Sequence, residues 1–317
     1  MRLTDADEAM TSGFRPAFDC GTFVCAMALA ASFMAGQLSH WQLARKPRDL
    51  MKYEQVYLRN IGLFTEEQQN CLRRAKVTVA GMGGVGGIQA ATLARMGIGE
   101  LVIMDPGVFD EPDMNRQFAA MQSTIGKNKA LATAPLLKDI NPFLKLTVLD
   151  RAPEKKAELA DAVRGSDLVI DAIDYRGFDY KVLFAEVARE QGLYNLTAPI
   201  PDFGTLLMIF DPRGMTLEQF YEAPTDRAAW PRHDIPLVKL MGSSRRSRNL
   251  TEFLEKKRPY ISSNGGAAAL AGGVLAAEAA FMITGLRPPA EIVAAPRVTY
   301  VDLWTRRFEI YDASKPS

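Results

Sequence analysis

The sequence predicts an α/β protein with a doubly wound, mostly parallel sheet of the Rossmann type, closed by a C-terminal helix and a hairpin. Three observations lead to this prediction. A glycine-rich turn follows an apolar strand within residues 77–87, further apolar strands alternate with helical segments, and acidic residues stand at the ends of two strands. Strands that alternate with helices form parallel sheets, because each parallel connection needs a crossover.

The expected elements follow one another from Thr65 onward. Thr65-Glu66-Glu67-Gln68 has the form of a capping box, so a helix begins there and runs through Leu72. Strands are expected at 77–80, 101–104, 147–149, 168–174 and 206–210, and helices after the glycine turn and at 157–163, 181–191 and 265–284. Residues 211–214 form a turn, and 298–301 with 307–311 suggest the closing hairpin.

The glycine-rich turn, Gly81-Met-Gly83-Gly84-Val-Gly86, is typical of a nucleotide phosphate site. Gly81 permits the tight turn, Gly83 lets the backbone approach a phosphate, and Gly86 lets the helix pack close to the strand. The helix N-terminus adds free N–H groups and a partial positive charge. Asp105 ends the next strand, at the distance expected of a ribose-binding acid.

Cations further along the chain favour nucleotidyl transfer over hydride transfer. Arg116 and Lys129 follow the strand that ends in Asp105, where connections fold back over a nucleotide crevice. A carboxylate that attacks the α-phosphate of ATP meets an anionic centre, and Arg, Lys and Mg²⁺ lower that barrier. Asp174 is expected to close the strand at 168–174, which suits Mg²⁺ or pyrophosphate, whereas Asp171 is expected to be structural.

From about residue 57 to 311 the chain resembles the ThiF/MoeB-type adenylyltransferases, the bacterial relatives of ubiquitin-activating enzymes. The resemblance is carried by the GxGGxG loop, by "LARMGIGELVIMD" ending at Asp105, by "NRQ" at 115–117, by "GKNK" ending at Lys129, by "INP" at 140–142 and by "DAID" ending at Asp174. A lone glycine loop would not be specific, but this ordered set is.

The resemblance implies a role for each matching residue. Asp105 would hold the ATP ribose, Arg116 and Lys129 would contact the phosphates, and Asp174 would help hold Mg²⁺. Arg59, in "YLRN", resembles the family arginine that reaches the ATP of the partner subunit in a homodimer. The remaining residues expected to bind the nucleotide are Gly81, Gly83, Gly84, Gly86 and Gln117.

Several positions depart from the family pattern. Gly107 stands where a second aspartate is common, and Asp113 stands where the family has an amide, which leaves room for a weakened enzyme. No Cys-x-x-Cys pair is present, so no zinc is expected. The three cysteines, Cys20, Cys25 and Cys71, all precede the glycine loop, so the activated acyl group is expected to pass directly to an external nucleophile.

The predicted function is ATP-dependent activation of a carboxylate, the C-terminus of a small ubiquitin-like sulfur carrier or a peptide, as an acyl-adenylate with release of pyrophosphate. Three alternatives stay open. The tRNA threonylcarbamoyladenosine dehydratases share "DAID" and "LAR-GIG"; Gly107 and Asp113 allow a non-catalytic nucleotide-binding scaffold; and a glycine loop can serve NAD or FAD.

Composition agrees with a cytoplasmic enzyme. The formal net charge is +1 over 317 residues, which gives no bulk attraction to DNA or membranes, and three cysteines without metal spacing fit a reducing compartment. We expect one adenylation domain at 51–317 and a separate extension at 1–50, either an appended helix or translated upstream sequence. The apolar run at 22–36 keeps a signal peptide or membrane anchor as alternatives.

The least regular part of the adenylation domain is the segment 215–259. It contains three prolines and two basic runs, at 243–248 and 256–258. The resemblance implies that this segment covers the site and holds the protein or peptide substrate. A solvated basic loop and an RNA contact are the other interpretations.

Overall fold

The computed structural model describes residues 50–233, 235–236 and 248–315. The chain divides into two compact units, Met1–Met51 and Lys52–Ser317, and the description below concerns the second unit. The basic run at 243–248 lies almost wholly outside the described residues, as do Cys20 and Cys25.

The first half of the unit contains α2 (Tyr53–Val56), η2 (Leu58–Asn60), α3 (Glu66–Arg74), β1 (Lys76–Ala80), α4 (Gly86–Met96), β2 (Glu100–Met104), η3 (Glu111–Asn115), α5 (Lys129–Ile140), β3 (Lys145–Leu149) and α6 (Lys156–Val163). The second half contains β4 (Leu168–Asp171), α7 (Phe178–Glu190), β5 (Tyr194–Thr197), β6 (Gly204–Phe210), α8 (Leu217–Phe220), η4 (Arg227–Arg232), α10 (Arg248–Leu254), α11 (Gly265–Thr284), η6 (Pro289–Glu291), β7 (Arg297–Asp302) and β8 (Arg307–Asp312).

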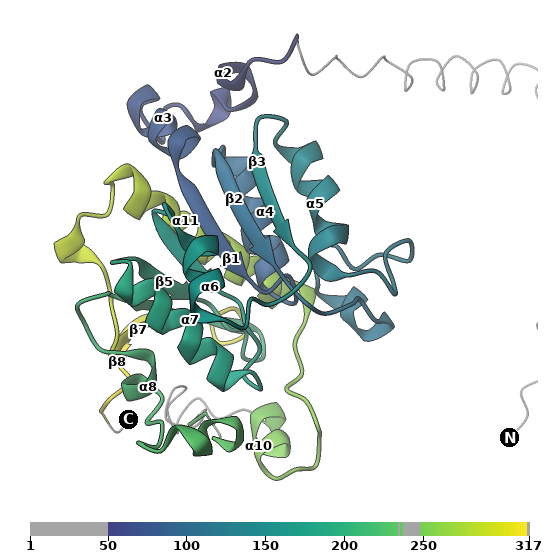
Figure 1. Ribbon diagram of the computed structural model, residues 1–317, viewed down its shortest axis with the longest axis vertical. Helices are drawn as coiled ribbons and strands as arrows, with labels where there is room; N and C mark the ends of the chain where they lie inside the picture. The colour runs from purple at the N-terminus through teal and green to yellow at the C-terminus, as the bar shows by residue number, and fades with distance from the viewer. Residues whose placement is uncertain (1–49, 234, 237–247, 316–317) are drawn as a thin grey trace, which may run out of the picture. The chain divides into compact units, whose positions relative to one another are not determined.

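These strands form one eight-stranded sheet in the order β3-β2-β1-β4-β5-β6-β7-β8. The pairs from β3 through β5 are parallel, and the pairs from β5 through β8 are antiparallel. The strand order reverses between β1 and β4, and a ligand crevice forms at such a reversal, outside the carboxyl ends of the strands. In Figure 1 the arrowheads of β1, β2 and β3 point away from α2 and α3.

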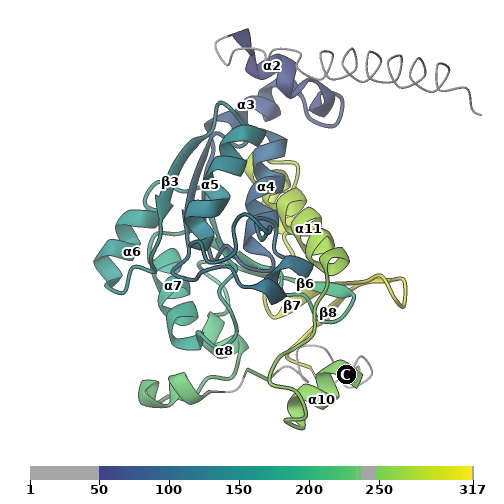
Figure 2. The same ribbon diagram turned by 90° about the vertical axis from the view of Figure 1, so that its right-hand side faces the viewer.

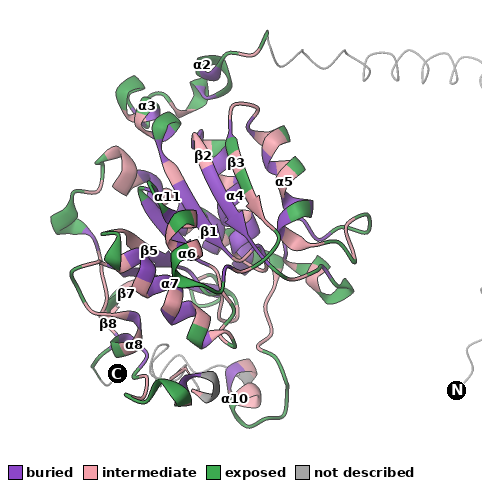
Figure 3. Cartoon of the chain, viewed as in Figure 1, coloured by how far each residue is buried: buried purple, intermediate pink, exposed green. Residues whose placement is uncertain are grey.

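Helices cover both faces of the sheet, as Figure 2 shows with α6 and α7 on one side and α4 and α11 on the other. Alternate residues of β1 serve the two layers. Val77 and Val79 pack with α4, α5 and α11, whereas Ala80 packs with α6 and α7. Buried residues therefore concentrate in the central strands (Figure 3), and the polar groups at the strand ends are held on a rigid base.

Helix α11 fits closely against α4. A Cβ atom at Gly272 would lie 2.9 Å from Ile88 Cγ1, so the two helices approach at a glycine. Among the described residues, α11 is the helix whose length and composition would also allow it to cross a membrane. Here its alanines Ala271, Ala276 and Ala279 are buried in the same core as Val77 and Val79, as in the core helix of an α/β domain.

Most expected elements agree with the structure. The capping box at Thr65 and Gln68 forms, the turn at 211–214 closes, and β7 and β8 pair as a hairpin. The expected end of β4 was wrong: the strand ends at Asp171, so Asp174 lies in the loop that follows and not in the strand. Helix α7 begins at Phe178 rather than at Lys181, and β5 and α5 were not expected.

Candidate active site

A cavity of about 660 Å³ lies at the carboxyl ends of the parallel strands, within the size range of sites for small molecules. We name its two ends by their residues. The glycine-loop end is formed by Gly81, Gly83, Gly84 and Val85 together with Asp105, Gly107, Arg116, Gln117 and Lys129. The β6 end is formed by Ile200, Asp202, Leu206, Tyr221, Ile235 and Leu250, and residues 171–175 lie between the two ends.

The glycine loop connects β1 to α4 in a conformation that needs glycine. Gly81 has a φ of +99°, and a Cβ there would lie 2.4 Å from the carbonyl oxygen of Ala172. A Cβ at Gly86 would lie 1.8 Å from the carbonyl oxygen of Gly81. Gly86 therefore does not line the cavity, but it lets α4 begin directly against the strand, immediately after Gly83, Gly84 and Val85, which do line it.

Asp105 is held rigidly at the end of β2. Its Oδ2 accepts the backbone N–H of Met82 at 2.6 Å, and its Oδ1 accepts that of Gly107 at 2.7 Å. The side chain is almost buried, and it lines the cavity. Each carboxylate oxygen has a second lone pair, so the group can still accept hydrogen bonds from the hydroxyls of a ligand.

Asp113 connects the three polar side chains that follow η3. Its carboxylate lies 3.0 Å from Lys129 Nζ and 3.6 Å from Arg116 Nη2, and it also accepts a hydrogen bond from Gln117 Nε2. Lys129 Nζ donates in addition to Gln117 Oε1 at 3.0 Å. Two cations and an amide are thereby gathered beside the glycine loop, with one carboxylate as their counterion.

Asp174 lines the cavity from the loop after β4. Its Oδ1 accepts the backbone N–H of Arg176 at 3.0 Å, which leaves Oδ2 without a partner among the described residues. No three His, Cys, Asp or Glu side chains gather as a metal group in the described part of the chain. A single carboxylate still fits Mg²⁺, because that ion is commonly held by one or two carboxylates together with substrate phosphates and water.

Sequence reasoning did not identify Lys181 as a site residue, and it interpreted Asp171 as structural only. In the structure Lys181 Nζ and Asp171 Oδ2 are 2.7 Å apart, both side chains are buried, and both residues line the cavity. Burial raises the pKa of Asp171, opposed by Lys181 and by the N–H of Ile173. A lysine on the buried face of α7 and an aspartate inside an apolar strand were the available signals.

The β6 end is assembled from segments that are far apart in the sequence. Asn249 Nδ2 donates to Asp202 Oδ1 at 2.8 Å and to the carbonyl oxygen of Ser262 at 3.1 Å. Asn115, from the "NRQ" triplet, donates to the carbonyl oxygen of Ser263 at 2.9 Å. The part of the segment 215–259 that is described thus contributes Tyr221, Ile235, Asn249 and Leu250 to the cavity wall.

Comparison with protein families gives a match to the ThiF family over residues 57–317. The chain belongs to the ThiF family. That span includes all of the cavity residues named above, so the family match and the cavity describe the same part of the molecule.

Among curated ThiF-family relatives, the chain is 40% identical over 124 residues to a tRNA threonylcarbamoyladenosine dehydratase of Haemophilus influenzae, a match that covers 38% of the chain and 47% of that protein. It is 30% identical over 190 residues to the sulfur carrier protein ThiS adenylyltransferase of Escherichia coli, covering 60% and 70%. It is 32% identical over 127 residues to the SAMP-activating enzyme E1 of Haloferax volcanii, covering 40% and 46%. The chain thus spans about half the length of the first and third of these.

Two solved structures share the fold. PaaA matches with a TM-score of 0.61 and 17% identity, over 94% of this chain and 87% of that one. Escherichia coli MccB, in a structure with ATP, matches with a TM-score of 0.59 and 16% identity, over 78% and 67%. At these identities the likeness concerns the fold, a mostly parallel sheet covered by helices.

Arg59 lies away from the cavity in this ThiF-family chain. It is exposed in η2, next to Asn60, whose Nδ2 donates to the carbonyl oxygen of Met96 at 3.1 Å. Met96 ends α4 and Gly86 begins it, so Arg59 is separated from the glycine loop by roughly 15 Å of helix. Within one chain Arg59 is not a cavity residue, and its role in a partner's site stays a prediction.

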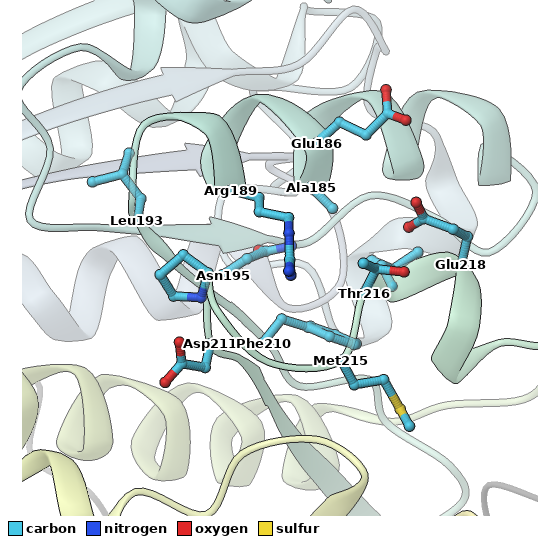
Figure 4. Close-up of a pocket in the computed structure, with 12 residues that line it drawn as sticks. Ala185, Glu186, Arg189, Leu193, Asn195, Phe210, Asp211, Met215, Thr216 and Glu218 are labelled. Carbon is cyan, nitrogen blue, oxygen red and sulfur yellow. The ribbon is translucent and has the colours of Figure 1, made fainter.

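A second hollow lies between α7, β6 and the start of α8, and Figure 4 shows the side chains around it. Its volume is about 30 Å³, which suits a water molecule rather than a nucleotide. Neither amide atom of buried Asn195 has a hydrogen-bond partner among the described residues. The large cavity is therefore the candidate active site.

Proposed function

We propose that the chain is an ATP-dependent adenylyltransferase that converts a carboxylate into an acyl-adenylate and releases pyrophosphate. One observation carries this proposal: Arg116, Gln117 and Lys129 are gathered in the same cavity as the glycine loop and Asp105. A site for hydride transfer does not require two cations beside the phosphates, because no phosphate bond breaks there. A site for nucleotidyl transfer does.

The residues divide the work as follows. The loop at 81–86 and the α4 N-terminus bind phosphate through backbone N–H groups, and Asp105 accepts hydrogen bonds from the ribose. Arg116 and Lys129 stabilise the charge that builds on the departing pyrophosphate. Asp174 would hold Mg²⁺, which supplies further charge neutralisation at the phosphates when it is bound.

The carboxylate belongs to the C-terminus of a small ubiquitin-like sulfur carrier or of a peptide. The name of the Escherichia coli relative, a sulfur carrier protein adenylyltransferase, supports a substrate of this kind. The enzyme acts as a homodimer in the cytoplasm, where ATP is available, and its adenylation domain begins near residue 51.

Within the described residues, no cysteine is placed to form a thioester with the acyl group. Cys71, the cysteine within the described residues, lies in α3, which precedes β1. It is therefore at the amino end of the strand, opposite the end where the cavity opens. Direct transfer of the acyl group to an external nucleophile is therefore part of the proposal.

Intact-protein mass spectrometry tests the adenylation. The full chain is incubated with ATP, Mg²⁺ and a panel of carrier proteins with free C-termini, and each carrier is compared with the same carrier lacking its last residue. We expect one full-length carrier to gain the mass of one adenylyl group, which is the mass of AMP less one water. ATP binding without any adenylate or pyrophosphate exchange across the panel would instead support the non-catalytic scaffold.

A second candidate function acts on tRNA, and the 40% identity to a tRNA threonylcarbamoyladenosine dehydratase favours it. Against it, two cations of the described basic run are paired within their own segment: Lys257 with Glu255 and Arg258 with Glu252, each at 2.8 Å. A gel shift of tRNA that is present at low salt and lost at high salt, with ATP-dependent change of the modified adenosine, would establish this candidate.

A further inference from the structure

Lys181 is a buried cation for which the described residues provide one hydrogen-bond partner. An ammonium group has three N–H donors, and among the described residues the hydrogen-bond partner of Lys181 Nζ is Asp171 Oδ2, at 2.7 Å. The residue is 4% exposed and lines the cavity. A buried ion pair by itself is weak evidence for a stabilising role, and this pair lies in the cavity wall, where the other donors of Lys181 can meet a ligand.

Tyr221 brings a second donor to the same wall. Phe178 and Lys181 are three residues apart on α7 and so share a face of that helix. The ring of Tyr221 packs against Phe178 with 6.0 Å between centroids. The Tyr221 hydroxyl contacts the thioether of Met208 at 3.9 Å, which is a weak acceptor. Burial, with a smaller contribution from the Asp171 charge, raises the pKa of Tyr221, so the hydroxyl keeps its proton and can donate.

This pair of donors stands one strand away from the glycine loop. Asp171, which holds Lys181, is the register partner of Ala80 at the end of β1, and Gly81 follows. The two ends of the cavity meet at Gly84, since a Cβ there would lie 3.5 Å from Arg116 Nε and 4.0 Å from Ile200 Cδ1. Arg116 and Lys129 are tied to Asp113, and Lys181 is tied to Asp171, so the cavity holds two separate cationic positions.

Resting on the adenylation proposed above, we propose that Lys181 and the Tyr221 hydroxyl receive the carboxylate that is to be activated, while Asp171 keeps the Lys181 ammonium in place. Lys181 and Tyr221 are substrate-binding residues in this proposal, and Asp171 is a positioning residue. Arg116 and Lys129 then bind the phosphates of ATP, and Lys181 binds the carboxylate of the second substrate.

The step that follows is balanced within the site. One oxygen of the carboxylate attacks the α-phosphorus and forms a new P–O bond, while the bond from that phosphorus to the oxygen bridging to the β-phosphate breaks. Pyrophosphate leaves with the electron pair, and no proton is transferred. Lys181 reduces the repulsion between the incoming carboxylate and the phosphates. The acyl-adenylate no longer carries the carboxylate charge, so Lys181 holds it less strongly and the acyl group becomes free for transfer.

The walls beyond Lys181 describe the rest of the substrate. Leu206, Ile235 and Leu250 make the β6 end apolar, and Asp202 at this end would repel a second acid. The part of the substrate next to its carboxylate should therefore be uncharged.

The test uses propionate and its uncharged isostere propionamide as probes of the full-length protein. Binding is followed by saturation-transfer NMR, and ATP binding is measured separately by calorimetry. We expect propionate to bind and propionamide not to bind. The variants are Asp171→Asn with Lys181→Met, which removes both charges together, then Lys181→Arg and Tyr221→Phe. The matched control is Lys156→Met, which removes a lysine from a surface pair with Glu190.

The double variant should bind propionate at least about tenfold more weakly, because a hydrogen bond to a charged group is lost, while ATP affinity stays unchanged. Lys181→Arg should retain binding, and the control should match the wild type. Equal binding of the two probes, or normal propionate binding by the double variant, would overturn the proposal. If the double variant does not fold, Tyr221→Phe decides: a few-fold loss supports the proposal and no loss contradicts it.

Failure of the adenylation proposal gives a different result. In that case propionate would bind through Lys181 as expected, but no AMP would form from ATP with any carrier.

Discussion

The two ends of the cavity are built in different ways. The glycine-loop end is centred on residues that directly follow two neighbouring parallel strands: Asp105, after β2, accepts the N–H groups of Met82, after β1, and of Gly107 at 2.6 and 2.7 Å. The β6 end joins Asp202 to Asn249, which are 47 positions apart in the sequence, and relies on the short helices α8 and α10.

This difference corresponds to the two ligands: the nucleotide is common to the family, whereas the carboxylate substrate differs from one member to another. A nucleotide has the same shape in every adenylation reaction, so its end of the cavity can be fixed by motifs on a rigid sheet. The substrate end lies on connecting segments, which vary more readily than the elements they connect. We therefore expect changes at the glycine-loop end to affect all substrates equally, and changes at the β6 end to affect the carboxylate alone.

The largest effect is expected from Arg116→Ala and Lys129→Ala. Each removes a cation from the glycine-loop end, so each should lower carboxylate-dependent pyrophosphate exchange by on the order of a hundredfold or more. The fold should persist, because neither side chain is part of the hydrophobic core; circular dichroism and thermal unfolding check this. Exchange at the wild-type rate in both variants would remove the basis of the mechanism.

The next largest effect is expected from Arg59→Ala, which tests whether a single chain forms a complete glycine-loop end. Arg59 is far from this end within its own chain, so Arg59→Ala should be inactive only if a partner's arginine is needed. Mixing Arg59→Ala with Lys129→Ala protein should then restore roughly a quarter of the sites, because only one site of each hybrid dimer carries both groups. The absence of any recovery, in a mixture shown to exchange subunits, would argue against a shared site.

Asp113→Asn should have a moderate effect, and it should strengthen ATP binding rather than weaken the function of the site. The substitution removes the carboxylate that lies 3.0 Å from Lys129 Nζ and 3.6 Å from Arg116 Nη2, so both cations become more available to phosphate. ATP should bind about fivefold more tightly by calorimetry, the size expected for a partly exposed charge pair. Asp161→Asn, on the surface of α6, is the control. Weaker ATP binding would mean that Asp113 serves mainly to position the two cations.

The smallest effect is expected from deletion of residues 1–50. The nucleotide motifs begin after them, and Thr65 already caps the helix that precedes β1. A protein beginning at Met51 should bind ATP as the full chain does. A soluble truncated protein that binds no nucleotide would show that the extension belongs to the active unit.

The glycine-loop end of the cavity could be predicted from the sequence far better than the β6 end. Val77 to Gly86 and Asp105 could be interpreted from the sequence, because strand, turn and acid stand at spacings that the nucleotide dictates. The end of β4 was misplaced by three residues, since Ala172 and Ile173 continue the apolar run although Asp171 already turns its carboxylate toward Lys181.

The β6 end could not be predicted, because no periodic pattern connects Ile200, Tyr221 and Leu250. Lys181 left a fainter signal. It shares the buried face of α7 with Phe184 and Ala188, and a lysine on such a face needs a buried acid. Asp171, an acid within an apolar strand, was the matching irregularity.

The identity of the nucleotide products tests the central claim most directly. Wild-type protein and Lys129→Ala are incubated with Mg²⁺, α-phosphate-labelled ATP and a carrier with a free C-terminus, and the labelled products are separated by chromatography. We predict that the wild type places the label in the acyl-adenylate and AMP, only when the carboxylate is present, and that the variant does not. Label recovered in ADP, or AMP formed equally without a carboxylate, would contradict the account.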